Sequence, residues 1–425
     1  MKIVHLSTYD SGGAGIAALR LHRALLKAGA DSCFIVPTKR SSVEGVSRLE
    51  TSRIGLAAAA VRRLRVRGIR IEASKYEASK PGGVEIFSDD RSSFDWRSDA
   101  RISGADIVNL HWVAGFMDHR HFFREAVRRG QAVVWTLHDM NPFTGGCHYT
   151  GDCTKYKAGC GACFQLGSRD PDDLSSRIWK RKNYAYARAR IKAVGSSRWI
   201  ADRARESSLM GKMPVTDISS SVPDEFFAGY KKEECRQTLN LPQDKTILLF
   251  GAERISNERK GIRYFSEALR IISSKMDVSG IEIAVFGKED KRSEVCGKIP
   301  VHYLGSIQDE KLLAACYSAA DIFVLPSLED NQPNTALESL ACGTMVVAFA
   351  AGGVPEMVEH GKTGLLSRLK DTEDLASNLR EAVENRSLRE AMSRNAAAVA
   401  RQRYRMEIQA ASYLDLYRGI LGGRT

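Results

Sequence analysis

The sequence lacks any apolar run of the roughly 20 residues that a helix needs to cross a bilayer. It also lacks a recognisable signal peptide, because the stretch from Met1 to Leu6 is short and strand-like and polar residues follow at once. No internal repeat is evident. These absences lead us to expect a cytosolic protein without a membrane-spanning segment.

The composition is that of a globular protein, with 43% hydrophobic and 27% charged residues. A chain of 425 residues is longer than a single hydrophobic core usually supports, so we expect two domains. The formal net charge of +12 favours an anionic partner, which could be nucleic acid, a phospholipid surface or a phosphorylated substrate. Charge alone does not distinguish these three.

Short β-branched apolar runs alternate with amphipathic helical stretches along the whole chain, which predicts an α/β fold with parallel sheets. The strands expected in the first half are Lys2 to Ser7, Ser32 to Val36, Asp106 to Leu110, Ala132 to Leu137 and Lys192 to Gly195. Those expected in the second half are Thr246 to Gly251, Glu282 to Gly287, Val301 to Leu304, Ile322 to Leu325 and Met345 to Ala348. Two sets of strands predict two sheets.

A polar run and a proline, Ser219 to Pro223, interrupt this pattern after a strand-like stretch and mark the expected hinge. The predicted domains therefore cover residues 1–220 and residues 221–403. Past Thr372 the sequence is helical to its end, and residues 404–425 carry apolar side chains at helical spacing. We expect this last helix to pack back onto the first domain.

The stretch from Leu325 to Glu338 runs from a buried strand into a helix that begins near Asn334, with Asn334 and Thr335 suited to the helix cap. A helix that starts at the carboxyl end of a strand presents free N–H groups to which a pyrophosphate can bind. Glu338, one turn into the helix, offers two acceptor oxygens to the hydroxyls of a ribose. The alternative is a glutamate that only complements the helix dipole, a contribution of about 0.3–1 kcal/mol.

Asp330 and Glu338 are separated by seven residues, and this spacing resembles the E-x7-E motif of retaining glycosyltransferases of family 4, also called group 1. Further blocks that resemble this family follow in its order: Phe250 to Arg254 with Lys260-Gly261, Tyr303 to Ser306, Ala320 to Ser327, Ala341 to Ala348, Gly352 to Val358 and Gly361 to Leu366. The sequence is identified on these blocks as similar to that family.

The resemblance implies a GT-B fold, in which two Rossmann-like domains face each other across a cleft, with the donor bound mainly by the second and the acceptor mainly by the first. It implies that Arg254 and Lys260 hold the donor diphosphate and that Glu338 holds the ribose. Cations fixed at these positions stabilise the negative charge that grows on the leaving diphosphate. Two solvated basic residues beside a loop are the alternative. No Asp-x-Asp pair lies near a strand end, and we expect catalysis without a metal cofactor.

The acidic loop departs from the family pattern. The usual glutamate followed by Gly-aromatic-Gly is here Asp330-Asn331-Gln332-Pro333, which shortens the acid and removes one backbone N–H. Asp330 is the expected contact to the donor, and Glu329 beside it is the alternative.

In the first half, a glycine-rich turn from Ser11 to Ala18 has the G-x-G-x-x-A spacing of dinucleotide-binding folds. An NAD enzyme would need an acidic residue after the second strand, and none follows Val36. In the resembling family this loop faces the donor phosphates, which implies that Gly12 and Gly13 allow close approach of the backbone.

A histidine followed by an acid, His138-Asp139, ends the strand from Ala132 to Leu137 and matches the family's cleft histidine. The resemblance implies that His138 faces the donor sugar, and a structural histidine at a strand end is the alternative. His111 and Trp112, at the end of the preceding strand, are candidate residues for the acceptor side.

Four cysteines lie within one short segment: Cys147, Cys153, Cys160 and Cys163. The segment resembles one in the colanic-acid and exopolysaccharide branch of the family. Four thiolates could form a tetrahedral zinc site, and Cys160-x-x-Cys163 has suitable spacing for one half of it. Structural zinc, free thiols and redox-linked pairs remain open.

The stretch from Arg53 to Arg70 is basic and partly amphipathic. It contains five apolar residues among five arginines: Ile54, Leu56, Val61, Leu64 and Ile69, with Arg62, Arg63, Arg65, Arg67 and Arg70. It could lie on the anionic inner face of a membrane beside a lipid-linked acceptor, or form the solvated face of an ordinary helix. Nucleic-acid binding is not expected, because no recognised module accompanies the charge.

Taken together, the sequence predicts a retaining hexosyltransferase, cytosolic or peripheral on the inner membrane, that acts in surface polysaccharide biosynthesis. It would transfer a sugar from a UDP- or GDP-linked donor to a saccharide or lipid-linked acceptor. Two other functions remain: a silent carbohydrate-binding protein that keeps the GT-B fold, and a Rossmann oxidoreductase.

Overall fold

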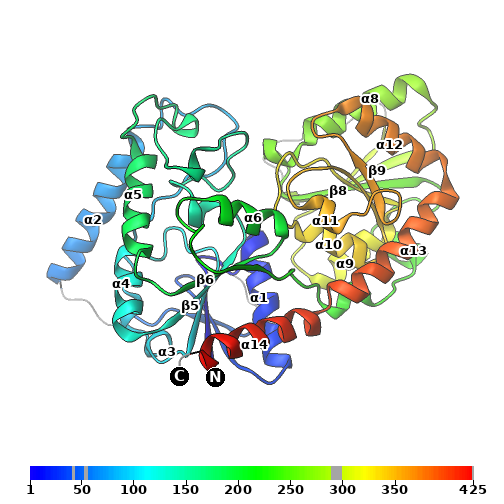
Figure 1. Ribbon diagram of the computed structural model, residues 1–425. Helices are drawn as coiled ribbons and strands as arrows, with labels where there is room; N and C mark the ends of the chain where they lie inside the picture. Colours follow the sequence, from blue (N-terminus) through cyan, green and yellow to red (C-terminus); the bar gives the residue numbers. More distant parts are fainter. Residues whose placement is uncertain (41–43, 52–55, 289–298, 424–425) are drawn as a thin grey trace. The chain divides into compact units, whose positions relative to one another are not determined.

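The computed structural model describes residues 1–40, 44–51, 56–288 and 299–423 (Figure 1). The chain divides into two compact units, the first made of Met1–Ile218 with Gln409–Thr425, and the second of Ser219–Ile408. Sequence analysis placed this boundary after residue 220 and the return of the chain at residue 404. Each unit is built around one parallel sheet.

The first unit contains a seven-stranded sheet with the order β3-β2-β1-β4-β5-β6-β7, in which every pairing is parallel. Its strands are β1 (Lys2–Leu6), β2 (Asp31–Val36), β3 (Val46–Arg48), β4 (Ile107–Leu110), β5 (Ala132–Leu137), β6 (Ile191–Gly195) and β7 (Val215–Asp217). Its helices are α1 (Gly12–Lys27), α2 (Leu56–Ser74), α3 (Ala100–Ser103), α4 (His119–Arg129), α5 (Leu174–Tyr186), α6 (Arg198–Glu206) and most of α14 (Met406–Gly422). Single turns of 3-10 helix lie at η1 (Trp96–Ser98), η2 (Asn141–Phe143), η3 (Lys155–Lys157) and η4 (Phe164–Leu166).

The second unit contains a six-stranded parallel sheet with the order β10-β9-β8-β11-β12-β13. Its strands are β8 (Thr246–Arg254), β9 (Ile281–Lys288), β10 (Val301–Gly305), β11 (Ile322–Leu325), β12 (Met345–Phe349) and β13 (Gly364–Ser367). Its helices are α7 (Lys232–Thr238), α8 (Ile262–Lys275), α9 (Glu310–Ala319), α10 (Asn334–Ala341), α11 (Val354–Met357), α12 (Thr372–Glu384) and α13 (Arg386–Arg403), with 3-10 turns at η5 (Asp224–Phe227) and η6 (Glu258–Lys260).

The apolar runs that predicted the strands are buried on both faces of the sheets. In β8, Ile247 and Leu249 enter one core cluster, while Leu248 and Phe250 enter the cluster on the opposite face. Helices therefore cover both faces, as parallel sheets with near-continuous apolar strands require. The predicted α/β class with two Rossmann-like domains is confirmed.

Each predicted strand is present, with ends that shift by a few residues. β8 is the largest departure, because it continues beyond Gly251 to Arg254 through an irregularity in its pairing with β9. Two short strands, β3 and β13, were not predicted, whereas β7 corresponds to the strand-like stretch noted before the hinge at Ser219. β3 and β13 contain few apolar residues and pair with one neighbour only, at the sheet edge.

The last helix packs against the sheet of the first unit through buried tyrosines. The Tyr413 hydroxyl lies 2.9 Å from Thr136 Oγ1 on β5, and Asn109 Nδ2 on β4 donates to the Tyr417 hydroxyl at 2.8 Å. Both tyrosines are fully buried. The helix therefore completes the core of the first unit, which is formed by two separate stretches of the chain.

In both sheets the strand order reverses at one point, between β1 and β4 in the first unit and between β8 and β11 in the second. Ligands of open parallel sheets bind outside the carboxyl ends of the strands at such a point. Most of the predicted site residues lie at or after the carboxyl ends of these four strands, and His138 follows the neighbouring strand β5. None of the described helices is long and apolar enough to cross a membrane.

Candidate active site

In the second unit, the loop after β8 packs against the loop after β11. The turn η6 begins where the Asn257 side chain accepts the N–H of Arg259 at 2.9 Å, and it ends at Gly261 in the left-handed conformation (φ 74°). A Cβ atom at Gly261 would lie 1.8 Å from the carbonyl oxygen of Pro326. Only glycine fits there, so this contact fixes where Lys260, the preceding residue, is presented.

Lys260 and Asp330 form an ion pair at this junction. Lys260 Nζ lies 2.6 Å from Asp330 Oδ2, and Arg259 Nη1 lies 3.3 Å from the same oxygen. Burial alone would raise the pKa of Asp330, but the charges of Lys260 and Arg259, with the hydrogen bond from Lys260, hold it below its usual value. Asp330 is therefore a buried carboxylate held by two cations.

The backbone of Asp330 is held from the opposite side by a glycine turn. Gly353 donates its N–H to the Asp330 carbonyl at 2.9 Å, and a Cβ atom at Gly352 (φ 57°) would lie 1.9 Å from that carbonyl oxygen. The Gln332 side chain bonds the Ser219 hydroxyl and accepts the N–H of Ser220 at 2.7 Å. The unusual acidic loop is thus anchored at both of its ends.

Helix α10 begins at Asn334, as predicted, but the predicted cap is wrong. Pro333 occupies the cap position, without a side-chain cap, and Asn334 and Thr335 are the first two residues of the helix. Proline has no N–H to lose at a helix start, which explains why it is tolerated there. Glu338 is buried in the same helix, 3% exposed, and its Oε2 accepts a hydrogen bond of 2.9 Å from the Tyr317 hydroxyl on α9.

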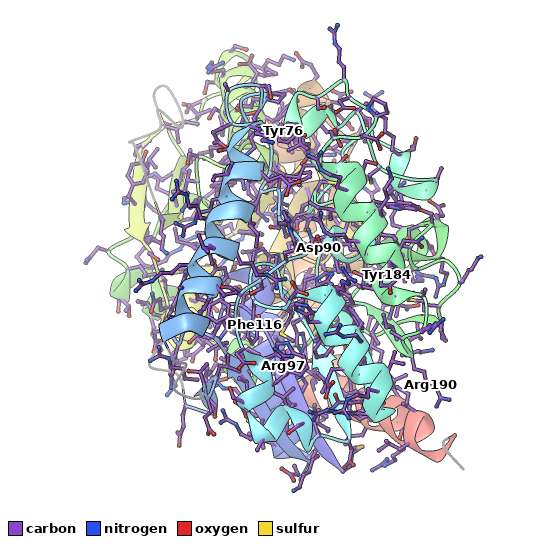
Figure 2. All side chains as sticks on the ribbon, turned by 90° about the vertical axis from the view of Figure 1, so that its left-hand side faces the viewer. Tyr76, Asp90, Arg97, Phe116, Tyr184 and Arg190 are labelled. Carbon is purple, nitrogen blue, oxygen red and sulfur yellow. The ribbon has the colours of Figure 1, made fainter. Side chains whose placement is uncertain are left out.

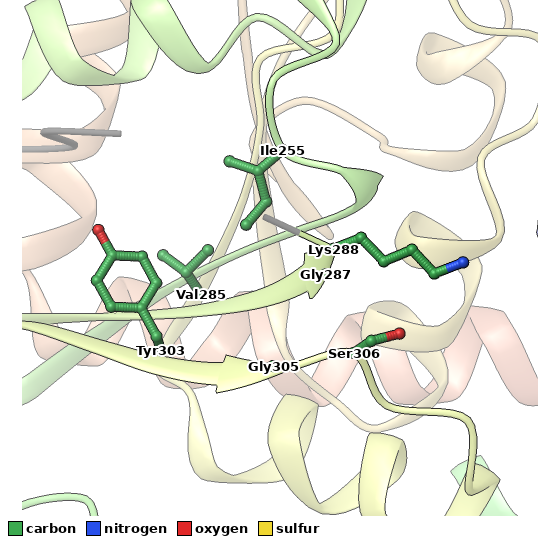
Figure 3. A pocket seen from close by; sticks show the side chains of 7 residues that line it. All are labelled: Ile255, Val285, Gly287, Lys288, Tyr303, Gly305 and Ser306. Atoms are coloured by element: carbon green, nitrogen blue, oxygen red, sulfur yellow. The ribbon is translucent and has the colours of Figure 1, made fainter. Parts of the chain in front are cut away.

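A pocket of about 320 Å³ opens in the same unit, toward the carboxyl ends of β8, β9 and β10 (Figure 3). The residues that line it are Ile255, Val285, Gly287, Lys288, Tyr303, Gly305 and Ser306. Arg254, the predicted diphosphate residue, ends β8 with its side chain exposed and is paired in register with Lys288 of β9. Two cations therefore lie side by side at this edge of the sheet.

In the first unit, the predicted glycines open helix α1 directly after the β1 loop. Gly12 has a positive φ of 73°, and a Cβ atom at Gly13 would meet nothing within 4 Å. Gly15 was not singled out, yet its Cβ would lie 2.6 Å from the Tyr9 carbonyl oxygen. Gly15 is therefore the glycine that close packing requires, whereas Gly13 leaves open space next to the helix start.

His138 ends a chain of hydrogen-bonded histidines. His138 Nε2 lies 3.0 Å from His111 Nδ1, and His111 Nε2 lies 2.9 Å from His5 Nδ1. Burial lowers the pKa of His138 to about 4, and it lowers the pKa of His5 and of His111 well below the usual value. The rings are therefore neutral near pH 7, and each link joins one N–H donor to one bare ring nitrogen.

Trp112 supports a neighbouring acid–histidine pair. Its Nε1 donates to Asp139 Oδ2 at 2.8 Å, and this oxygen lies 2.6 Å from His148 Nδ1. The Trp112 ring stacks with those of His148 and Tyr9. Burial would raise the pKa of Asp139, but the interactions with His148 hold it below its usual value. The structure thus places Trp112 in a packed polar cluster next to the histidine chain.

The four clustered cysteines, Cys147, Cys153, Cys160 and Cys163, are free thiols that line one small cavity. Among the described residues, no group of three or more His, Cys, Asp or Glu side chains is arranged to hold a metal ion. The thiols are therefore gathered together without coordinating geometry.

The predicted basic stretch forms helix α2 from Leu56 onward, whereas Arg53 lies outside the described residues. Two of its arginines face the protein: Arg65 is paired with Asp118, and Arg62 donates to Ser93. Farther along the chain, Asp90 lies between α2 and α5, where it pairs with Arg181 at 2.6 Å (Figure 2). The helix is thus fastened to the first unit along one side.

Three candidate residues were missed by sequence analysis. Arg259 adjoins Lys260 in the same turn, Lys288 follows directly after the predicted end of a strand, and Tyr317 holds the carboxylate of Glu338. A pattern of basic residues just after strand ends could have identified the first two. Tyr317 gave no signal, because its contact depends on the packing of two helices.

Part of the second unit matches a known protein family. Residues 244–385 match the family model described as glycosyl transferases group 1, and this segment contains β8, η6, β11 and α10 with all of the second unit's predicted site residues. This segment is similar to the group 1 glycosyltransferases.

A curated relative matches part of the chain, and two solved structures match its fold. The N,N'-diacetylbacillosaminyl-diphospho-undecaprenol alpha-1,3-N-acetylgalactosaminyltransferase of Campylobacter jejuni is 33% identical over 192 residues, which cover 44% of this chain and 48% of that protein. The chain thus spans about half the length of this relative. Sucrose-phosphate synthase of Thermosynechococcus elongatus matches over 100% of both chains, with a TM-score of 0.66 and 18% identity. Anabaena Alr3699/HepE, solved with UDP and glucose, matches 99% of this chain and 100% of its own, with a TM-score of 0.66 and 16% identity. These likenesses show the fold, that of GT-B glycosyltransferases.

Proposed function

We propose that this protein transfers a sugar from a nucleotide-diphosphate donor to a saccharide or lipid-linked acceptor, with retention of the anomeric configuration. The observation that carries the proposal is the junction at the β8–β11 switch point, where Lys260 and Arg259 meet Asp330 within the segment that matches the group 1 family. Cations and a helix start gathered at this point suit a diphosphate.

In the proposed reaction, the bond between the sugar and the diphosphate breaks while negative charge grows on the leaving oxygens. Arg254 and Lys260, with Lys288 as a further cation at the same sheet edge, would stabilise that charge. The positions are fixed beforehand by the Gly261 contact, so little reorganisation is needed when the charge appears. This arrangement favours catalysis without a metal ion.

The nucleoside would occupy the remainder of the same edge. Glu338, kept in place by Tyr317, has the acceptor oxygens that a ribose needs, and the pocket of about 320 Å³ has the size of a small-ligand site. UDP is the donor nucleotide that we favour, because HepE, which shares the fold, was solved with UDP. His138, neutral at physiological pH, would act on the sugar as a hydrogen-bonding group and not as a cation.

The proposal is tested with Lys260→Ala and Glu338→Ala, each paired with a matched exposed control, Lys275→Ala or Glu381→Ala. We expect the first two variants to lose at least about a hundredfold in turnover, the typical effect of removing one charge-stabilising group, and to keep the circular dichroism spectrum of the folded wild type. Lys260→Ala should unfold at a lower temperature, because it leaves the buried Asp330 carboxylate with one cation fewer. Near wild-type turnover in either would contradict the assignment.

Two further measurements address the donor and the stereochemistry. Thermal-shift assays should show stabilisation by UDP or GDP without added magnesium, and no stabilisation by NAD. Proton NMR of the product should show the anomeric configuration of the donor, and an inverted product would exclude retention. Binding of the nucleotide with no transfer to any acceptor would favour the silent carbohydrate-binding protein instead.

We also propose that α2 contacts an anionic membrane surface that carries a lipid-linked acceptor. The side of the helix away from the protein holds three strongly exposed apolar residues, Val61, Leu64 and Ile71, whose exposed fractions are 66%, 67% and 51%. The exposed arginines beside them are Arg63, Arg67 and Arg70. An apolar stripe flanked by arginines matches the headgroup region of acidic lipids.

Sedimentation with vesicles tests this second proposal. The wild-type protein should pellet with phosphatidylglycerol-containing vesicles and not with phosphatidylcholine alone, and Leu64→Asp should weaken this binding. Ile86→Asp is the control, because Ile86 is 63% exposed outside α2. Equal binding by both variants, or none by the wild type, would refute the membrane contact.

A further inference from the structure

The long connection between β5 and α5 folds with little regular structure of its own. Residues 138–173 contain only three single 3-10 turns among the described elements, η2, η3 and η4. Loops longer than about 12–15 residues without secondary structure are uncommon in compact domains unless something else fixes them. This connection carries four cysteines, and all four are free thiols.

The four thiols share one cavity whose size suits a single ion. The space open to the centre of a water-sized sphere is about 20 Å³, and Cys147, Cys153, Cys160 and Cys163 all line it. Such a space holds about one water-sized particle. A disulfide joins only two sulfur atoms, at about 2.05 Å, and so does not explain why four cysteines line one cavity.

Backbone groups already point at two of the sulfur atoms. The N–H of Gly145 donates to Cys160 Sγ at 3.1 Å, and backbone hydrogen bonds from Gln165 and Leu166 reach Cys163. Hydrogen bonds of this kind favour the charged form of a sulfur ligand. Burial outweighs these hydrogen bonds and raises the pKa of Cys160 to about 11 and the pKa of Cys163 above its usual value, so both groups are neutral thiols until an ion binds.

The turn between Cys160 and Cys163 is held in an unusual backbone conformation. Ala162 has a positive φ of 43°, rare for a residue with a side chain, and its N–H donates to the Asp170 carbonyl at 2.8 Å. The neighbouring Gly161 packs so tightly that a Cβ atom would lie 2.3 Å from the Pro171 carbonyl oxygen. The surrounding chain thus fixes the spacing of these two cysteines.

Two lysines supply positive charge around the cavity. Lys155 lines it and donates to the carbonyls of Gly161 and Ala162 at 2.9 and 2.7 Å. Lys182, fully buried on α5, donates to the Thr144 carbonyl at 3.1 Å. Four thiolates around a divalent ion carry a net charge of about −2, which two ammonium groups offset.

We propose that Cys147, Cys153, Cys160 and Cys163 bind one zinc ion as a tetrahedral structural site. Each thiol releases its proton to solvent and its sulfur binds the ion at about 2.3 Å, with no change of oxidation state. Because the thiols in the described residues are not yet arranged to hold a metal, binding turns them about their Cα–Cβ bonds into the cavity that they already line. The site does not depend on the proposed transferase activity.

Metal analysis of untagged, reduced protein tests the site. Wild-type protein purified without chelator should contain about one zinc per chain, and the double variant Cys160→Ser/Cys163→Ser should contain less than about a fifth of that. Cys33→Ser and Cys235→Ser are the controls, because these free thiols do not line the cavity, and both should keep the zinc. Less than about a fifth of one zinc in the wild type, even after incubation with zinc under reducing conditions, would overturn the proposal.

A second measurement uses the wild-type chain alone, in case the double variant does not fold. Cobalt added to the chelator-treated protein should give the intense visible absorption of tetrahedral thiolate coordination, and one equivalent of zinc should abolish it. Zinc should also protect four thiols from modification by a thiol reagent and raise the unfolding temperature. Absence of the cobalt spectrum would overturn the zinc site. A native protein whose mass is lower by two hydrogens, because two of these four cysteines form a disulfide, would also overturn it.

Discussion

The ion pair between Lys260 and Asp330 joins two residues whose charges both lie at the proposed diphosphate site. The Asp330 carboxylate supplies one negative charge to this site, and it contacts both Lys260 and Arg259. A donor diphosphate brings two further negative charges to the same cations. Asp330 therefore serves to hold Lys260 in position, in addition to any contact with the sugar.

Asp330→Asn should destabilise the protein because it leaves a partly buried lysine without its charged partner. We expect the free energy of unfolding, measured by urea denaturation at pH 7, to fall by about 1.5–3 kcal/mol. A carboxyl group whose folded pKa is depressed stabilises above its unfolded pKa, near 3.9, and loses that contribution as the pH falls through the folded pKa. The difference from wild type should thus shrink below about pH 4. Glu329→Gln, its neighbour, should not show this pH-dependent difference.

The buried histidines should make the first unit sensitive to acid. His22 Nδ1 lies 2.8 Å from Ser32 Oγ, and burial lowers the pKa of His22 to about 4. Between about pH 6.5 and pH 4, the unfolded chain therefore binds a proton at His22 that the folded chain does not bind. Stability is then full above pH 6.5 and falls as the pH drops through this window. We expect His22→Gln to reduce the loss between pH 7.5 and pH 5 by about 1–2 kcal/mol in urea titrations. An unchanged pH dependence would show that His22 is not buried in the neutral form.

Among the elements, strands were the part of the fold that the sequence predicted best, because buried parallel strands are near-continuous apolar runs such as Ile322 to Leu325. β3 and β13 gave no comparable run and were missed. The cap of α10 was misplaced because Asn334 is a typical cap residue, whereas the backbone turn begins at Pro333.

The candidate site was predictable only in part, because the sequence shows local patterns but not the contacts between distant residues. Strand ends and glycine turns indicated where Lys260 and Glu338 lie along the chain. The pairing of Lys260 with Asp330, 70 residues apart, and of Glu338 with Tyr317 depends on how β8, β11 and the helices pack. Such long-range contacts leave no local pattern in the sequence.

The turn that follows β8 allows a test at this scale. Gly261→Ala places a side chain in a left-handed conformation and drives its Cβ into the Pro326 carbonyl, so the loop must shift. We expect a loss of more than about 1 kcal/mol in the free energy of unfolding, together with weaker UDP binding, because Lys260 directly precedes Gly261 in the same turn. Gly280→Ala is the control, since its Cβ would meet nothing within 4 Å, and it should change stability by less than about 0.5 kcal/mol.

At the scale of the whole molecule, the first unit depends on a helix from the other end of the chain. Tyr417→Phe removes the acceptor of Asn109 Nδ2 and leaves a buried amide donor without that bond. We expect the free energy of unfolding of the first unit to fall by about 1–3 kcal/mol, read from hydrogen exchange of amides in β4 and β5. Amides of the second unit should exchange at unchanged rates. Arg418→Ala, an exposed neighbour, should leave both sets unchanged.

This return of the chain sets an order for folding during synthesis. The ribosome completes residues 1–218 first, but Tyr413 and Tyr417 are made only after the whole of residues 219–408 has been translated. At about 5–20 residues per second, that interval lasts roughly 10–40 s. The second unit comes later in the sequence, but it is the earlier of the two to have all its residues synthesised. Until Tyr413 and Tyr417 are made, part of the core of the first unit stays uncovered.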